Sequence, residues 1–182
     1  QHLKEGINMA VTLNETPSGN RLHIGIFGKT NSGKSSFINT FSGQKVSIVA
    51  DVAGTTTDPV YKPMEIYPLG PCILIDTAGF DDEGELGALR IEKTSLAAQK
   101  TELAIILFCE DEMVQELKWY NYFKKRQTPV IPVLGKADLY TQEQKEYLIQ
   151  MIQKNTGETV CPVSSETGEG IRKLKELLAD MT

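Results

Sequence analysis

Cysteine and histidine are scarce in this chain. Its 182 residues include three cysteines, Cys72, Cys109 and Cys161, and two histidines, and no pair of cysteines has C-x-x-C spacing. Iron–sulfur clusters and structural zinc ions need about four such ligands. Each cysteine lies in or beside an apolar run, so we interpret all three as small buried residues of a reducing compartment. We therefore expect no iron–sulfur cluster in this chain alone.

Long hydrophobic runs and basic patches are also missing. No apolar run approaches the roughly 20 residues that a membrane helix needs, and no basic segment followed by an apolar core marks a signal peptide. The net charge is −5 with a pI near 5.2, which argues against a dedicated nucleic-acid binder. The basic cluster at residues 124–126 is interpreted as a solvated helix end. These absences predict a cytoplasmic protein with no membrane or nucleic-acid partner.

The length predicts one domain with one sizeable core, because 40% of the 182 residues are hydrophobic. Residues 1–20 show no strong periodicity of apolar residues and are interpreted as an N-terminal arm. Within this arm, residues 1–8 precede Met9 and are interpreted as remnants of cloning. Residues 21–182 form the expected domain. Because the chain stops directly after a helix-like segment, we expect it to be an excised domain.

Residues 28–36 carry the strongest motif, GKTNSGKSS, which fits the phosphate-binding pattern G-x-x-x-x-G-K-[ST] at every required position. Glycine at both ends lets backbone N–H groups turn toward a polyphosphate. An apolar run at residues 22–27 precedes the loop, and a helix is expected from about Lys34, whose first-turn N–H groups favour an anion. The sequence therefore predicts a strand, a phosphate loop and a helix.

Seven residues of this loop are predicted to contact a nucleotide. Lys34 would reach the β- and γ-phosphates as the catalytic cation, and the Ser35 hydroxyl would bind Mg²⁺. The full set is Thr30, Asn31, Ser32, Gly33, Lys34, Ser35 and Ser36.

Apolar runs and helical stretches alternate along the chain, which predicts an α/β fold with a mainly parallel sheet and helices on both faces. A turn signal at residues 68–71 makes one strand antiparallel, giving a mixed six-stranded sheet. The expected strands are 22–27, 60–67, 72–75, 103–108, 130–134 and 159–163. After the helix that starts near residue 34, a second helix is expected to end near residue 100. It should follow an acidic, flexible stretch at residues 80–89. Three more helices are expected at residues 113–126, 141–155 and 171–178.

The loops after the strands hold the other candidate residues. The long polar connection at residues 43–59 suggests a functional loop. Asp76 ends an apolar strand, where ligands bind in open α/β sheets, and could hold Mg²⁺ through a water. The Gly79 N–H could meet a γ-phosphate oxygen, so this loop would differ between triphosphate and diphosphate states.

Base recognition is assigned to the loop after strand 130–134. The Asp138 carboxylate can accept hydrogen bonds from the N1–H and N2 amine of guanine, whereas adenine would leave it desolvated and unpaired. The Lys136 side chain could lie along the base plane. Ser164 and Ser165 would offer backbone N–H groups to guanine O6.

These segments, in this order, resemble the five guanine-nucleotide motifs of translation-factor-type (TrmE-Era-EngA-like) small GTPases. They are the phosphate loop, GTT at residues 54–56, DTAG at 76–79, KAD at 136–138 and SS at 164–165. The resemblance covers about residues 20–180 and implies a Ras-like P-loop NTPase fold. It also implies that Thr56 is the switch threonine that closes on Mg²⁺, and that the protein binds and hydrolyses GTP to GDP.

A longer set of residues resembles the HydF family, the GTPases that mature FeFe hydrogenases. This set includes GTTTDPV at 54–60, the Leu69-Gly70-Pro71 turn and DDEGELG at 81–87. The family implies a switch that regulates assembly or delivery of the di-iron subcluster. It further implies a C-terminal dimerisation and cluster-binding region, the other maturases and hydrogenase as partners, and a dimer that depends on nucleotide or potassium.

Three positions depart from the usual motifs. Gly135 replaces the Asn or Thr that ties the base loop to the phosphate loop, and Ser165 replaces an Ala. Phe80 stands where Ras-like enzymes keep a water-orienting Gln, so hydrolysis must draw on another group.

Asn31 matches the loop asparagine of potassium-dependent GTPases, which suggests a slow, K⁺-stimulated GTPase. The alternative is an Asn merely tolerated in a turn.

Two other functions stay open. A tRNA-modification or ribosome-assembly GTPase of the same superfamily would carry an RNA-binding module or a basic surface. A P-loop small-molecule kinase would need an acceptor pocket and a lid, and would have no reason to keep Lys136 and Asp138.

Overall fold

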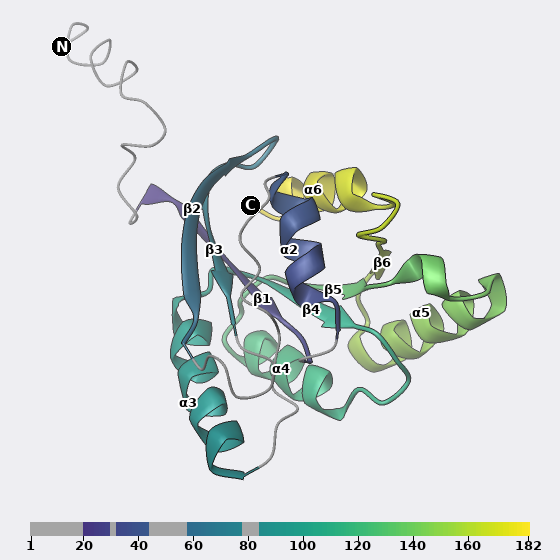
Figure 1. Ribbon diagram of the computed structural model, residues 1–182, viewed down its shortest axis with the longest axis horizontal. Coiled ribbons are helices and arrows are strands. Elements are labelled where there is room, and N and C mark those ends of the chain that lie inside the picture. Colours follow the sequence, from purple (N-terminus) through teal and green to yellow (C-terminus); the bar gives the residue numbers. More distant parts are fainter. Residues whose placement is uncertain (1–19, 30–31, 44–57, 78–83) are drawn as a thin grey trace, which may run out of the picture.

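A single mixed sheet of six strands organises the chain in this computed structural model (Figure 1). The structure describes residues 20–29, 32–43, 58–77 and 84–182. The strands are β1 (Leu22–Phe27), β2 (Val60–Ile66), β3 (Gly70–Asp76), β4 (Leu103–Phe108), β5 (Val130–Leu134) and β6 (Cys161–Pro162). The helices are α2 (Lys34–Ser42), α3 (Gly84–Lys100), α4 (Val114–Lys125), α5 (Gln142–Thr156) and α6 (Ile171–Asp180), with a 3-10 turn at Ala137–Leu139.

The strand order is β2-β3-β1-β4-β5-β6, and one pair, β2 with β3, is antiparallel. The pairs β1–β3, β1–β4, β4–β5 and β5–β6 are all parallel. The predicted fold class is therefore confirmed, including the hairpin. Because the parallel strands share one direction, the loops that leave their carboxyl ends gather at one edge of the sheet.

Alternating side chains of β4 show how the sheet separates two apolar layers. Leu103, Ile105 and Leu107 belong to a cluster with α2 and α6, whereas Ala104, Ile106 and Phe108 belong to a cluster with α3, α4 and α5. All six residues are buried. The predicted arrangement of helices on both faces is confirmed, and Figure 1 shows α2 and α6 on the side opposite α3 and α4.

Two predicted boundaries were wrong. Helix α3 begins at Gly84, inside the stretch expected to be flexible, because the residues from 85 to 89 are mostly strong helix formers. Strand β6 has two residues rather than five. It is an edge strand that pairs with Val133 and Leu134 alone, and Pro162 has no N–H to extend the ladder.

The cysteines lie largely in the core. Cys72 and Cys161 are buried and Cys109 is half-buried. Burial raises the pKa of the Cys72 thiol to about 11, so it stays protonated at neutral pH. Among the residues that the structure describes, no three histidine, cysteine, aspartate or glutamate side chains are arranged so that they could hold a metal ion. In the same residues, no helix has both the length and the apolarity to cross a membrane.

Helix α5 starts from a capping box formed by Thr141 and Gln144. The Thr141 side chain accepts a hydrogen bond from the Gln144 N–H at 3.2 Å, and the Gln144 side chain accepts one from the Thr141 N–H at 3.0 Å. This reciprocal cap fixes the helix directly after the Ala137–Leu139 turn.

Replacing the capping hydroxyl should destabilise the fold without touching the sheet edge. Thr141→Ala should lower the free energy of unfolding by about 1 kcal/mol, because one helix N–H loses its partner. Thr141→Ser keeps a hydroxyl and serves as the control. Urea denaturation followed by circular dichroism measures both, and equal stabilities of the two variants would contradict the capping role.

Candidate nucleotide-binding site

The phosphate-loop motif lies between the end of β1 and the start of α2, at the edge where the parallel strands end. Gly33 adopts φ 82 and caps α2, and the Phe37 N–H donates to the Gly33 carbonyl at 2.9 Å. A side chain at Gly28 would start 2.7 Å from the Ser32 hydroxyl. Both motif glycines are therefore required, the first by close approach and the second by its left-handed backbone.

Two predicted residues meet at the mouth of this loop. The Lys34 Nζ donates to Asp76 Oδ1 at 2.8 Å, and the Lys34 side chain is 2% exposed. Lys34 comes from the first turn of α2 and Asp76 from the last position of β3. The structure thus brings together the predicted phosphate-binding ammonium group and the predicted Mg²⁺-associated carboxylate.

The serines of the loop face different surroundings. Ser32 is buried, and its hydroxyl has no hydrogen-bond partner among the described residues. Ser35 is half-buried and Ser36 is exposed in the first turn of α2. A buried hydroxyl without a partner costs free energy unless a ligand satisfies it.

A cavity of about 410 Å³ connects the phosphate loop to the predicted base-recognition residues. Ser32, Gly33 and Ser36 line one side of it, and Lys136, Asp138 and Ser165 line the other. The cavity therefore joins two motifs that are separated by about a hundred residues in the sequence.

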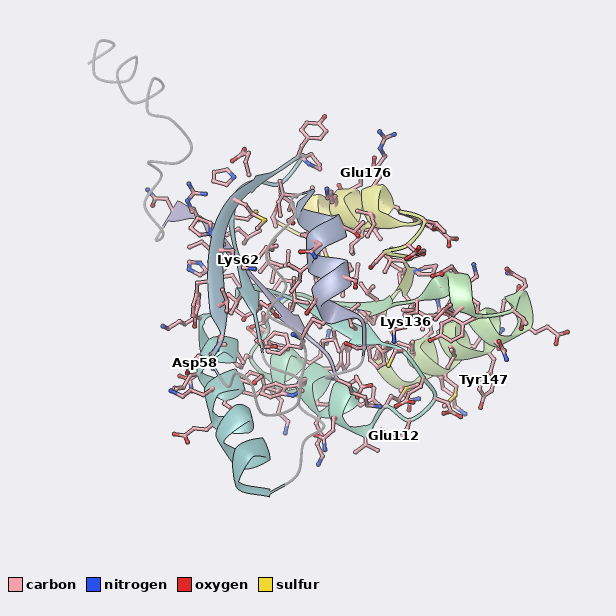
Figure 2. All side chains as sticks on the ribbon, in the orientation of Figure 1. Asp58, Lys62, Glu112, Lys136, Tyr147 and Glu176 are labelled. Carbon is pink, nitrogen blue, oxygen red and sulfur yellow. The ribbon has the colours of Figure 1, made fainter. Side chains whose placement is uncertain are left out.

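Lys136 bridges these two sides. It has φ 57, and its Cε lies 3.2 Å from where a Gly33 Cβ would stand, so its stem passes over the phosphate loop. Figure 2 shows Lys136 beside the N-terminal end of α2. The Gly135 N–H donates to the Phe108 carbonyl at 2.9 Å. Although Gly135 has no side chain, the contact through Lys136 still joins the base loop to the phosphate loop.

Asp138 is held by Ser164, in a way the sequence did not indicate. The Ser164 hydroxyl donates to Asp138 Oδ1 at 2.8 Å and accepts from the Thr167 N–H at 3.1 Å. Ser164 is fully buried. Because the SS motif was interpreted through its backbone alone, the role of this hydroxyl in orienting the carboxylate was missed.

The structure does not favour Ser164 as the predicted backbone donor to guanine, because its N–H already has a partner. Its N–H donates to the Glu169 carbonyl at 3.0 Å. Ser165, which lines the cavity, remains as the donor from this loop.

Four predicted site residues lie outside the described residues. They are Thr30 and Asn31 of the phosphate loop, the switch threonine Thr56, and Gly79. Phe80 lies outside them as well.

Sequence reasoning also gave Lys29 no role. This lysine follows Gly28 directly, and its side chain is 8% exposed and surrounded by three glutamates, Glu110, Glu112 and Glu116. The sequence did hold a signal for this cluster, because three closely spaced glutamates directly follow the apolar strand at residues 103–108.

The sequence and the fold both match known GTPases. Residues 23–136 match a protein family described as 50S ribosome-binding GTPase. GTPase Der of Wolinella succinogenes is 35% identical over 173 residues, which cover 90% of this chain and 36% of that protein. The tRNA modification GTPase MnmE of Aliarcobacter butzleri is 35% identical over 79% of this chain and 33% of that protein.

Solved structures agree with the sequence comparison. Era of Aquifex aeolicus bound to GDP and AlF4⁻ superimposes with a TM-score of 0.75 at 26% identity, covering 87% of this chain and 56% of that chain. Era was also solved in complex with MgGDPNP and nucleotides 1506–1542 of 16S ribosomal RNA, with a TM-score of 0.74 at 27% identity.

The chain spans about a third of the length of the curated relatives it matches. The family match is to GTPases, so the kinase alternative gains no support. The chain therefore belongs to the family of 50S ribosome-binding GTPases and is a GTP-binding, GTP-hydrolysing domain of the translation-factor type.

Proposed function

We propose that GTP binds with its phosphates on the loop from Gly28 to Ser36 and its base in the cavity beside Lys136 and Asp138. The observation that carries this proposal is the continuous cavity between the two motifs, with the buried Lys34 ammonium group at the loop. The Ser32 hydroxyl, buried and without a partner among the described residues, supports a ligand at the same place.

The Lys34–Asp76 pair prepares the phosphate end of the site. A polyphosphate that reaches the loop competes with Asp76 for the Lys34 ammonium group, because charge-assisted bonds to phosphate oxygens are at least as strong. The carboxylate released from Lys34 is then available to a metal-bound water. The oxygen donors of Ser35, Asp76 and Thr56 suit Mg²⁺, which when bound neutralises the charge of the β- and γ-phosphates.

Asp138 reads the base in this proposal. Its carboxylate lines the cavity and is oriented by the Ser164 hydroxyl. Two guanine donors, N1–H and the N2 amine, satisfy a carboxylate, and adenine supplies neither at those positions. The Lys136 stem covers one face of the base, and the Ser165 N–H meets O6.

Position 80 is a phenylalanine, so no glutamine there can orient the attacking water. The phosphate loop also holds no arginine that could supply positive charge to the transition state. We propose that K⁺, held by the Asn31 side chain and the loop near Gly54, supplies the missing positive charge. The resemblance of Asn31 to the asparagine of potassium-dependent GTPases supports this. Thr56 and Gly79 would close on the Mg²⁺ and the γ-phosphate in the triphosphate state.

Two cellular processes compete for the whole protein. Ribosome assembly or tRNA modification is favoured by the comparisons, since the matching family is described as ribosome-binding and the relatives include a tRNA modification GTPase. Hydrogenase maturation is favoured by one further observation, the residues at 54–60 and 81–87 that resemble HydF. In both, the domain acts as a GTP-operated switch for parts of a larger protein.

Changing the base-reading carboxylate should change nucleotide preference. Asp138→Asn should weaken GTP binding and strengthen xanthosine triphosphate binding, each by about 10- to 100-fold, because xanthine presents a carbonyl at C2 that needs a donor. Fluorescent-nucleotide titration measures both affinities.

The exposed carboxylate of Asp180, at the end of α6, provides the control variant Asp180→Asn. Ser164→Ala, which frees Asp138 from its hydroxyl partner, should weaken GTP binding by about fivefold. An Asp138→Asn variant that still prefers GTP would remove Asp138 from base recognition.

Potassium should raise the rate of hydrolysis. Turnover is expected to be several-fold higher in KCl than in NaCl at equal ionic strength, because a cage of several oxygens fits the larger ion. Asn31→Ala should erase the difference while nucleotide affinity stays near the original value. Equal rates in the two salts, at protein concentrations high enough for dimers, would exclude the potassium role.

The iron, sulfide and RNA content of the longer protein distinguishes the two processes. If it matures hydrogenase, the longer protein purified anaerobically should contain stoichiometric iron and sulfide, whereas residues 1–182 alone should contain neither. If it serves ribosomes or tRNA, the longer protein should retain RNA and contain no iron. Finding RNA without iron would overturn the hydrogenase assignment, and iron without RNA would overturn the other.

A further inference from the structure

An ion cluster around the buried Lys29 ammonium group fixes the first side chain of the phosphate loop. The Lys29 Nζ donates to Glu110 Oε1 at 2.6 Å, to the Glu112 carbonyl at 2.6 Å and to Glu112 Oε2 at 2.8 Å. It also lies 3.4 Å from Glu116 Oε2. The Lys29 ammonium group therefore forms ion pairs with three carboxylates.

Glu110 and Glu112 belong to the segment that joins β4 to α4, and Glu116 belongs to the first turn of α4. Glu112 Oε1 accepts from the Val114 N–H at 3.0 Å, so this side chain holds the start of α4 and the phosphate loop together. Glu116, in the first turn of α4, gains further from the positive end of the helix dipole.

Glu116 makes the cluster difficult to break. Its side chain is fully buried, and its two carboxylate oxygens have no hydrogen-bond partner among the described residues. Burial raises the pKa of Glu116 to about 7. Burial also lowers the pKa of Lys29, but hydrogen bonds to Glu110 and Glu112 and the charge of Glu116 outweigh this, so its pKa lies above the ordinary value. Lys29 therefore stays charged and in place.

Lys29 and Lys34 differ in whether a bound nucleotide would replace their carboxylate partners. Lys34 faces one carboxylate, Asp76, and exchanges it for phosphate in the proposed function. Lys29 is enclosed by carboxylates that would repel a phosphate, so it remains bound to them when a nucleotide arrives. The Ser32 N–H donates to the Lys29 carbonyl at 3.0 Å, and Ser32 lines the nucleotide cavity.

We infer that Lys29 is a positioning residue for the GTPase reaction. Its ion cluster fixes the start of the phosphate loop to the β4–α4 segment, and thereby sets the positions of the loop residues that follow it. This inference rests on the proposed nucleotide site. It also makes Glu110 and Glu112, whose side chains are 53% and 58% exposed, a route by which a change at the surface alters nucleotide affinity.

A set of variants separates positioning from simple stability. Lys29→Met removes the cation from the buried Glu116, which must then stay unpaired or take up a proton, so both the thermal midpoint and GTP affinity should fall, the affinity by about tenfold. Lys29→Met with Glu116→Gln removes both charges, so the thermal midpoint should recover while GTP affinity stays low. Lys29→Arg keeps the cation and should stay within about threefold of the original affinity.

The matched control is Lys124→Met, which removes an ion pair to Glu158 at the other end of α4 and should leave GTP affinity unchanged. Fluorescent-nucleotide titration, steady-state KM and kcat, and calorimetric melting supply the readouts. Recovery of affinity in the double variant, or unchanged affinity in a folded Lys29→Met protein, would overturn the positioning role. If the unsubstituted protein binds no GTP, the proposed function itself fails and this inference with it.

Discussion

Two lysine–carboxylate interactions hold the loop between β1 and α2, and the candidate site depends on them. Lys29 is bound to Glu110 and Glu112 after β4 and to Glu116 in α4, and Lys34 is bound to Asp76 at the end of β3. A loop built to receive a polyphosphate concentrates backbone N–H groups and positive charge, and these must be kept in place before the anion arrives. Asp76 at the end of β3 provides this support at one end, and the glutamates that follow β4 provide it at the other.

The parallel sheet makes this support possible. The chain segments that follow β1, β3, β4, β5 and β6 meet at one edge because these strands run in the same direction. Residues far apart in the sequence thereby share one cavity, with Ser32 opposite Asp138. A change in one loop can reach the others through few contacts, as a switch domain requires.

The sequence predicted the parts of this structure that depend on local pattern. The presence and order of the six strands, the hairpin pairing and the start of α2 at Lys34 follow from apolar runs, a turn signal and glycines, and they are confirmed, although β6 is shorter than predicted. The interactions that could not be predicted join distant segments. The Ser164 hydroxyl on Asp138 spans 26 residues and Lys29 on Glu110 spans 81, and no local pattern encodes either.

The comparisons show a GTPase domain, and we propose that the cavity beside Asp138 and the phosphate loop select guanine nucleotides. Titration calorimetry of the nucleotide-free chain with GTP and with ATP, in Mg²⁺ buffer, measures this selection. We expect saturable binding of GTP, no measurable binding of ATP at the same concentration, and loss of GTP binding in the Lys34→Ala variant. ATP binding as tight as GTP binding, or GTP binding that Lys34→Ala leaves unchanged, would contradict it.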